Sequence, residues 1–191
     1  MCVCVAPTKR MARAVAPAPP SENGSVLIVL FMMAIILALG TMGSVSLYVE
    51  ATLNPQAAKY NKKRVTLMAG WANVANALTH LILVILLLSS KQRLIEAGIE
   101  DAEDISGPVF LLLINGAVGW RTLSGAGPIV AFGWNVFVAI TGTLVPLVWP
   151  RFVNTGLAEW PYPLVFMWLL IFVFESMAFF SSAVWLALKK Y

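Results

Sequence analysis

Charged residues are scarce in this chain of 191 residues: only 12% are Asp, Glu, Lys or Arg, whereas 60% are hydrophobic. A soluble domain carries about twice that charged fraction. Lipid is therefore the main solvent that the composition indicates, and the apolar segments leave no room for a soluble domain of ordinary size. The net charge of +4 is modest, and its basic groups flank apolar segments. That placement is typical of membrane-surface anchors and excludes a nucleic-acid patch.

Metal-ligating residues and catalytic motifs are also missing. The two cysteines, Cys2 and Cys4, lie in the N-terminal tail and are too close for an unstrained disulfide. His80 is the only histidine, which excludes a haem held by two histidines and leaves a zinc site incomplete. A phosphate loop, a dinucleotide-binding glycine pattern, HExxH and GxSxG are absent. We therefore predict a non-catalytic protein without a metal or cofactor, apart from bound lipids. A pigment or haem with His80 as its single axial ligand stays open.

Long apolar stretches predict an all-α, polytopic integral membrane helix bundle in an unspecified membrane. We expect a flexible, basic, Ala- and Pro-rich tail over residues 1–24 and one transmembrane domain over residues 25–191. Residues 50–64, which end in Lys62-Lys63-Arg64, are predicted to form a loop, and residues 91–106 an acidic connector. The predicted spans are 26–49, 65–89, 108–123, 129–149 and 163–188.

The stretch 107–127 allows two descriptions, because its apolar part is short and Gly125, Gly127 and Pro128 then break the chain. It is either a short span whose Arg121 reaches the membrane surface or a re-entrant half-helix buried in protein. The bundle accordingly has five transmembrane helices, or four plus a re-entrant segment. Five spans with the N-terminus outside would place Lys62-Lys63-Arg64 and Lys189-Lys190 on the inner side, as the positive-inside rule favours.

Glu175 is the most informative residue, since it lies in the middle of the uncharged run from Pro163 to Leu188. A helix of that length places the carboxylate near the bilayer midplane, where an ionisable group is costly unless it faces protein or water. An acid in such a position is by default a functional residue. Ala178 and Ser182 share its helical face, and these small residues favour close contact with another helix.

A second polar face runs along the predicted span 65–89, where Thr66, Asn73, Asn76 and His80 are separated by seven, three and four positions. Amides in hydrocarbon need partners, so this face must meet another helix or a watery cavity. Our hypothesis is that His80 approaches Glu175 and that Asn73 or Asn76 completes the contact. Thr66 and Ser182 are the further members of this predicted ion or proton pathway, or buried polar network.

Arg121 is a second possible partner for the Glu175 carboxylate, if the stretch 107–127 folds inward. Asn115 and Asn135 are further candidates for buried polar positions. The alternative to a functional network is a set of interhelical hydrogen bonds that only fix the bundle.

Three functions remain compatible with the sequence. The first is a non-catalytic accessory subunit that packs against other membrane proteins, or against copies of itself, through small-residue and polar faces. The second is a small channel or a proton- or cation-linked transporter that uses Glu175, with His80, Asn73 and Asn76 along the path. The third is a pigment- or haem-binding membrane protein with His80 as ligand.

Overall fold

The chain folds as a bundle of α-helices in the computed structural model, which describes residues 22–96, 105–126, 128–138, 140 and 162–190. Three segments are long and apolar enough to cross a membrane: Leu30–Leu53, Pro55–Gln92 and Phe166–Ala187. The predicted helical membrane fold is therefore confirmed. The five α-helices of the described ranges are α1 (Glu22–Leu53), α2 (Pro55–Glu96), α3 (Ser106–Arg121), α4 (Ile129–Val138) and α7 (Tyr162–Ala187).

Several predicted segments fall partly beyond these ranges. Residues 1–21 of the predicted tail, residues 97–104 of the acidic connector and residues 141–149 of the predicted fourth span lie outside the described residues. α1 already begins at Glu22, inside the predicted tail.

The predicted loop at 50–64 is wrong, because helices occupy almost all of it. α1 continues to Leu53 and α2 starts at Pro55, so the connection is the single residue Asn54. The Asn54 Oδ1 accepts a hydrogen bond from the Gln56 backbone N–H at 3.0 Å, which is the N-cap arrangement. Pro55 follows at the first helical position, where its fixed φ suits a helix and its missing N–H costs nothing. The Asn-Pro pair therefore allows a one-residue turn where polarity alone indicated a loop.

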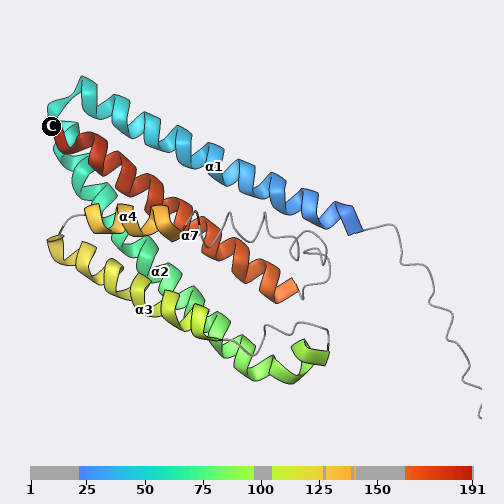
Figure 1. Ribbon diagram of the computed structural model, residues 1–191. Coiled ribbons are helices and arrows are strands. Elements are labelled where there is room, and N and C mark those ends of the chain that lie inside the picture. The colour runs from blue at the N-terminus through green and yellow to red at the C-terminus, as the bar shows by residue number, and fades with distance from the viewer. Residues whose placement is uncertain (1–21, 97–104, 127, 139, 141–161, 191) are drawn as a thin grey trace, which may run out of the picture.

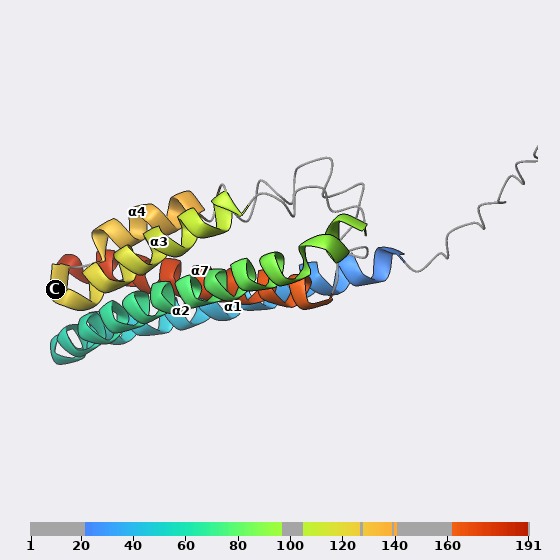
Figure 2. The same ribbon diagram turned by 90° about the horizontal axis from the view of Figure 1, so that it is seen from below.

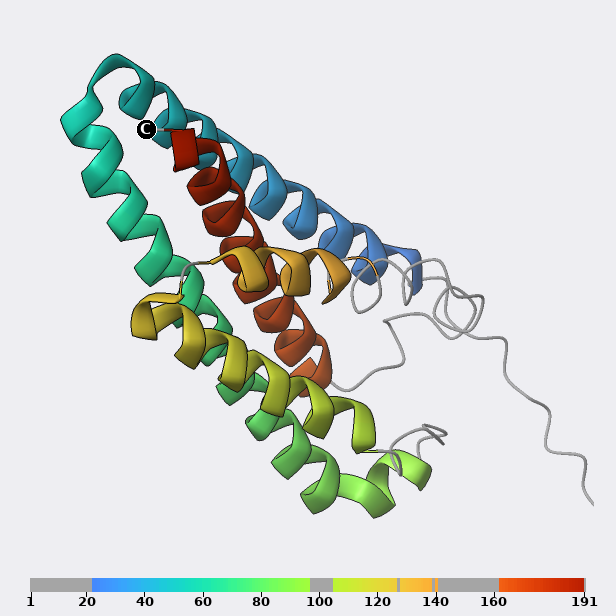
Figure 3. The same ribbon diagram turned by 60° about the vertical axis from the view of Figure 1, so that its left-hand side comes forward.

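α2 is the central helix of the bundle. α7 and α1 lie along one side of it, α3 along another, and α4 packs on α7 (Figure 1 and Figure 3). Seen from below, α3 and α4 form a second layer, which lies against α2 and α7 (Figure 2). Polar positions of α2 that would face water in an isolated helix are thereby covered from several sides.

α3 and α4 form a helical hairpin. α3 has 16 residues and α4 has 10, so both are shorter than the three spanning helices. A wider turn at Thr122–Ala126 separates them, and Gly125 there has φ 91°, a left-handed conformation that glycine adopts without steric cost. The hairpin agrees with the predicted chain break, and its short helices suit either a short span or a re-entrant segment.

Glycine allows α3 to approach α2 closely. A Cβ placed on Gly119 would lie 3.0 Å from the Gly70 carbonyl oxygen, 3.0 Å from the Val74 backbone nitrogen and 2.8 Å from the Val74 Cγ2. Two of these three atoms belong to backbone, which cannot move aside without moving a helix. The contact between α2 and α3 therefore depends on the missing side chain at position 119.

The C-terminal end of α7 lies beside the start of α2 (Figure 1). Leu188 packs with Ala51, Ala58 and Val65, and the Lys62 Nζ lies 5.4 Å from the centre of the Trp185 ring. Lys62 and the end of α7 are thus at the same end of the bundle, where the positive-inside pattern expects them to share a side of the membrane.

Candidate functional site: a buried polar layer

α2 buries its predicted polar face. Asn73, Asn76 and His80 are each at most 2% exposed. The Asn73 Nδ2 donates to the Ala69 carbonyl oxygen at 2.8 Å, and the His80 Nδ1 lies 2.8 Å from the Asn76 carbonyl oxygen. Because a carbonyl oxygen only accepts, the Nδ1 carries the hydrogen and the Nε2 is the nitrogen left for another partner.

α3 and α4 each add a buried asparagine. The Trp134 Nε1 of α4 donates to the Asn115 Oδ1 of α3 at 2.7 Å, so this amide joins the two arms of the hairpin. Asn135 lies on the buried stripe of α4 with Ala131 and Val138, at positions four and three apart. The position of Asn135 among apolar residues at helical spacing is the sequence pattern that predicts its burial.

α7 contributes Glu175, which is 4% exposed. Glu175 has at least one interaction partner in the structure, so it is not an isolated residue. Ala178 and Ser182, the small residues on the same face, are also buried, and the Ser182 Oγ donates to the Ala178 carbonyl oxygen at 2.7 Å. Small side chains at these positions let α7 pack closely in the bundle, as the sequence predicts.

The contacts of α7 with α2 place Glu175 at the level of the α2 stretch that holds Asn73 and Asn76. Lys62 of α2 lies over Trp185 of α7, and the two helices run antiparallel. Glu175 precedes Trp185 by ten positions and Asn73 follows Lys62 by eleven, so the two residues reach about the same level. His80 lies two helical turns farther along α2.

Contacts of α3 and α4 bring their asparagines near the same level. A Cβ placed on Gly116 would lie 3.9 Å from the Ala77 Cβ, which sets Asn115 within a turn of Asn76. The hydrogen bond from the Trp134 Nε1 to the Asn115 Oδ1 places Trp134 of α4 at the same level. Asn135 is the next residue of α4 and therefore lies close to this level. The stacked rings of Phe132 and Phe179, 5.7 Å apart, connect α4 to α7 about one turn from Glu175. We call this set the central polar layer: Asn73, Asn76, Asn115, Asn135 and Glu175.

The layer lies at mid-depth in the membrane-spanning part of the bundle. Arg64 and Lys91 bracket an uncharged stretch of α2, residues 65–90, and Asn76 is close to its middle. A helix stretch of this length spans the hydrocarbon core. The layer therefore lies near the middle of the uncharged stretch of α2.

All four amides in the layer are incompletely paired. Among the described residues, five buried side-chain atoms have no hydrogen-bond partner: Asn73 Oδ1, Asn76 Oδ1, Asn115 Nδ2, Asn135 Nδ2 and Asn135 Oδ1. Buried polar groups in folded proteins are almost always paired, and each unpaired one costs roughly 1–3 kcal/mol. These five atoms belong to asparagines of α2, α3 and α4, and they mark the candidate site.

The remaining predicted site residues stay apart from the layer. Thr66 donates to the Lys62 carbonyl oxygen at 2.8 Å, so its hydroxyl, like that of Ser182, is satisfied by its own helix. Arg121 is exposed at the end of α3. The predicted direct approach of His80 to Glu175 stays a prediction.

A metal site does not emerge from the described part of the chain, where no three His, Cys, Asp or Glu side chains gather. His80 with its remaining Nε2 is the residue that could ligate a pigment or haem, and that reading stays a prediction.

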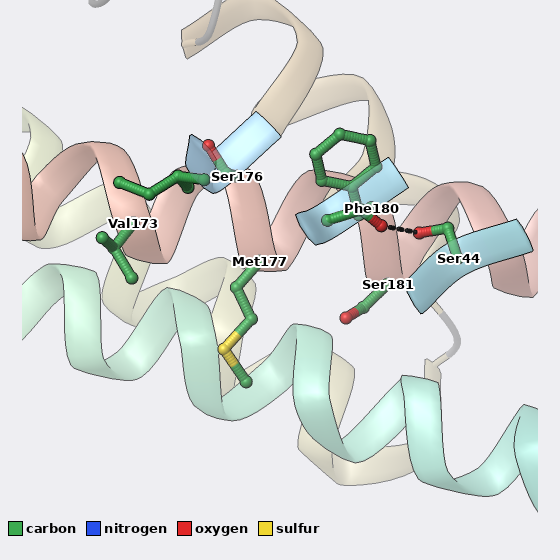
Figure 4. Close-up of a pocket in the computed structure, with 8 residues that line it drawn as sticks. Ser44, Val173, Ser176, Met177, Phe180 and Ser181 are labelled. Atoms are coloured by element: carbon green, nitrogen blue, oxygen red, sulfur yellow. Dashed lines mark hydrogen bonds between the residues drawn. The ribbon is translucent and has the colours of Figure 1, made fainter. Parts of the chain in front are cut away.

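A second feature lies on the surface, in a groove between α1 and α7. Small and hydroxyl-bearing residues make up much of its lining, and the ring of Phe180 lies beside Ser44 (Figure 4). The Ser44 Oγ donates to the Gly40 carbonyl oxygen at 2.7 Å. The groove is lined by Ile36, Gly40, Ser44, Val173, Ser176, Met177, Phe180 and Ser181.

Comparisons with protein-family models, curated proteins and solved structures found no match to this chain. Fold and site together define a helical membrane protein with a polar layer across the middle of its bundle.

Proposed function

We propose that this membrane protein is non-catalytic and passes protons or small monovalent cations through its central polar layer. The observation that carries the proposal is the set of five unpaired amide atoms at the level of Glu175. A network that only fixed the helices would gain most by pairing every amide, because a half-satisfied network is less stable than an apolar core. Glu175 supplies a group that can take up and release a proton.

Glu175→Gln is the direct test. The amide keeps the size of the side chain but cannot exchange a proton, so proton flux into liposomes that contain the purified chain should fall roughly a hundredfold or more. Flux is measured with a pH-sensitive dye under a potassium-valinomycin potential, and rubidium uptake is measured in the same vesicles.

Thr66→Val and Ser182→Ala are the matched controls, because both hydroxyls bond to their own helix and should leave flux within about twofold of the parent. The proposal fails if vesicles with folded parent protein are no more permeable to protons or rubidium than empty vesicles.

The accessory-subunit function is a second candidate, supported by the α1–α7 groove. Its occupant would be one transmembrane helix of another subunit, since glycine and serine in a membrane-facing groove favour helix contact over lipid tails. Met177 is partly exposed there, so Met177→Trp should fill the groove without disturbing the interior.

Extracts of native membranes test this candidate by native electrophoresis. The parent protein should migrate in a complex, Met177→Trp should migrate free, and Leu39→Trp on an exposed face of α1 should behave like the parent. A parent protein that already migrates alone excludes the subunit role.

A further inference from the structure

We infer that the central polar layer binds water molecules and excludes bare metal cations, which would make the proton the species that the proposed function carries. The inference rests on that proposed function for its physiological meaning, and on the hydrogen-bond roles of individual amide atoms for its chemistry.

Asn73 presents an acceptor to the layer. Its bonded atom lies 2.8 Å from the Ala69 carbonyl oxygen, and a carbonyl only accepts, so the bonded atom must be the NH2 group. The oxygen is then the atom left without a partner, and the assignment of the two amide atoms follows from the bond itself.

Asn115 presents a donor by the same reasoning. The Trp134 Nε1 only donates, so the Asn115 atom that it contacts at 2.7 Å must be the oxygen. The NH2 group of Asn115 is left unpaired, and it carries two hydrogens. Asn135 adds both a donor and an acceptor, because neither of its amide atoms is paired among the described residues.

A mixed set of donors and acceptors matches water better than any metal ion. A buried water molecule makes about three hydrogen bonds and both donates and accepts. A sodium or potassium ion needs a shell of oxygen atoms, and the positive edge of the Asn115 NH2 group would repel it. Only two of the four asparagines, Asn73 and Asn76, offer acceptors alone among their unpaired atoms.

Water in this layer would connect the amides to the level of Glu175. A proton can pass between water molecules and a carboxylate without either moving far, whereas a metal ion would have to lose its hydration shell at mid-depth in the bundle. The hydrogen bond from Trp134 fixes the position of Asn115 across the α3–α4 hairpin. The NH2 group of Asn115 is therefore the group that favours water over a metal cation.

The experiment is NMR of the full chain, labelled with nitrogen-15 asparagine, in nanodiscs of deuterated lipid. Magnetisation transfer from water to the side-chain NH2 groups of Asn115 and Asn135 is expected, and the Asn73 NH2 group, which donates to Ala69, should show at least severalfold weaker transfer. Adding sodium or rubidium chloride should leave these resonances unshifted. Absence of water transfer at Asn115, or a saturable shift with either salt in the parent protein, would overturn the inference.

Asn115→Asp is the matched variant. It keeps the oxygen that accepts from Trp134 and the size of the side chain, but replaces the free NH2 group with a second oxygen. Rubidium should now give a saturable shift of the Asn73 and Asn76 resonances, and no shift would count against the proposed role of the NH2 group. The NMR readout does not depend on flux, so a failure of this inference and a failure of the proposed conduction are separate results. Rubidium uptake by the parent protein, for example, would overturn the exclusion of cations but would still support conduction.

Discussion

Gly119→Leu is expected to separate α3 from α2 and to lower the free energy of unfolding by about 3 kcal/mol or more. The added side chain would start from a Cβ that already lies 3.0 Å from two backbone atoms of α2. Overpacked sites usually relax by moving side chains, at a cost of about 1–3 kcal/mol, but here the Gly70 carbonyl and the Val74 nitrogen can move only with their helix. Unfolding of the purified protein in mixed dodecyl sulfate micelles measures the change.

Gly133→Ala is the control for this prediction. Gly133 is exposed on α4, and no atom lies within 4 Å of a Cβ placed there. Alanine should leave the fold intact and add up to about 1 kcal/mol of stability, because glycine is a poor helix former. A Gly119→Leu protein as stable as the parent would mean that α2 and α3 do not approach as closely as the structure places them.

Asn135→Leu is expected to change stability and function in opposite directions. Leucine has a similar size and no polar atoms, so it removes two unpaired amide atoms from the buried stripe of α4. The free energy of unfolding should rise by up to about 2 kcal/mol. Proton flux in liposomes should fall at least roughly tenfold, because residues that are kept at a cost in stability are typical of functional sites.

Asn61→Leu provides the comparison. Asn61 is as buried as Asn135, but its Nδ2 donates to the Glu50 Oε2 at 3.0 Å and to the Leu47 carbonyl oxygen at 3.4 Å. Its replacement should lower stability by about 1 kcal/mol and leave flux unchanged. If Asn135→Leu also lost stability, the Asn135 amide would have a partner within the protein. Its two atoms would then no longer count among the unpaired atoms that support a functional site.

The first and last spans were predictable because hydrocarbon length and apolar runs determine them directly. Glu22–Leu53 and Tyr162–Ala187 agree within a few residues with the predicted spans 26–49 and 163–188. The error at 50–64 arose because charge was taken as a sign of a loop, whereas a long helix carries Lys62, Lys63 and Arg64 without ending. Helix termini follow capping residues such as Asn54, and these lie outside the hydrophobic pattern.

The site was harder to predict, because sequence shows which residues are polar but not where their hydrogen bonds go. Thr66 and Ser182 entered the predicted network, yet each bonds to a carbonyl of its own helix, an option that any buried threonine or serine has. Asn115 and Asn135 stood only as further candidates, since their place depends on how the α3–α4 hairpin lies against α2 and α7. Helical periodicity gives the face of a residue and leaves its level in the bundle undetermined.

The unbroken course of α2 has a mechanical consequence. The 14 residue steps from Lys62 to Asn76 cover roughly 21 Å of helix, about two-thirds of the thickness of the hydrocarbon core, whereas the C-terminal end of α2 bends away from the rest of the helix (Figure 3). The same helix holds Lys62, Lys63 and Arg64 near one end and Asn73 and Asn76 farther along, so the two groups move together. A force on the basic residues, such as attraction to anionic headgroups, would tilt this stretch of α2 and displace the amides relative to Glu175 of α7.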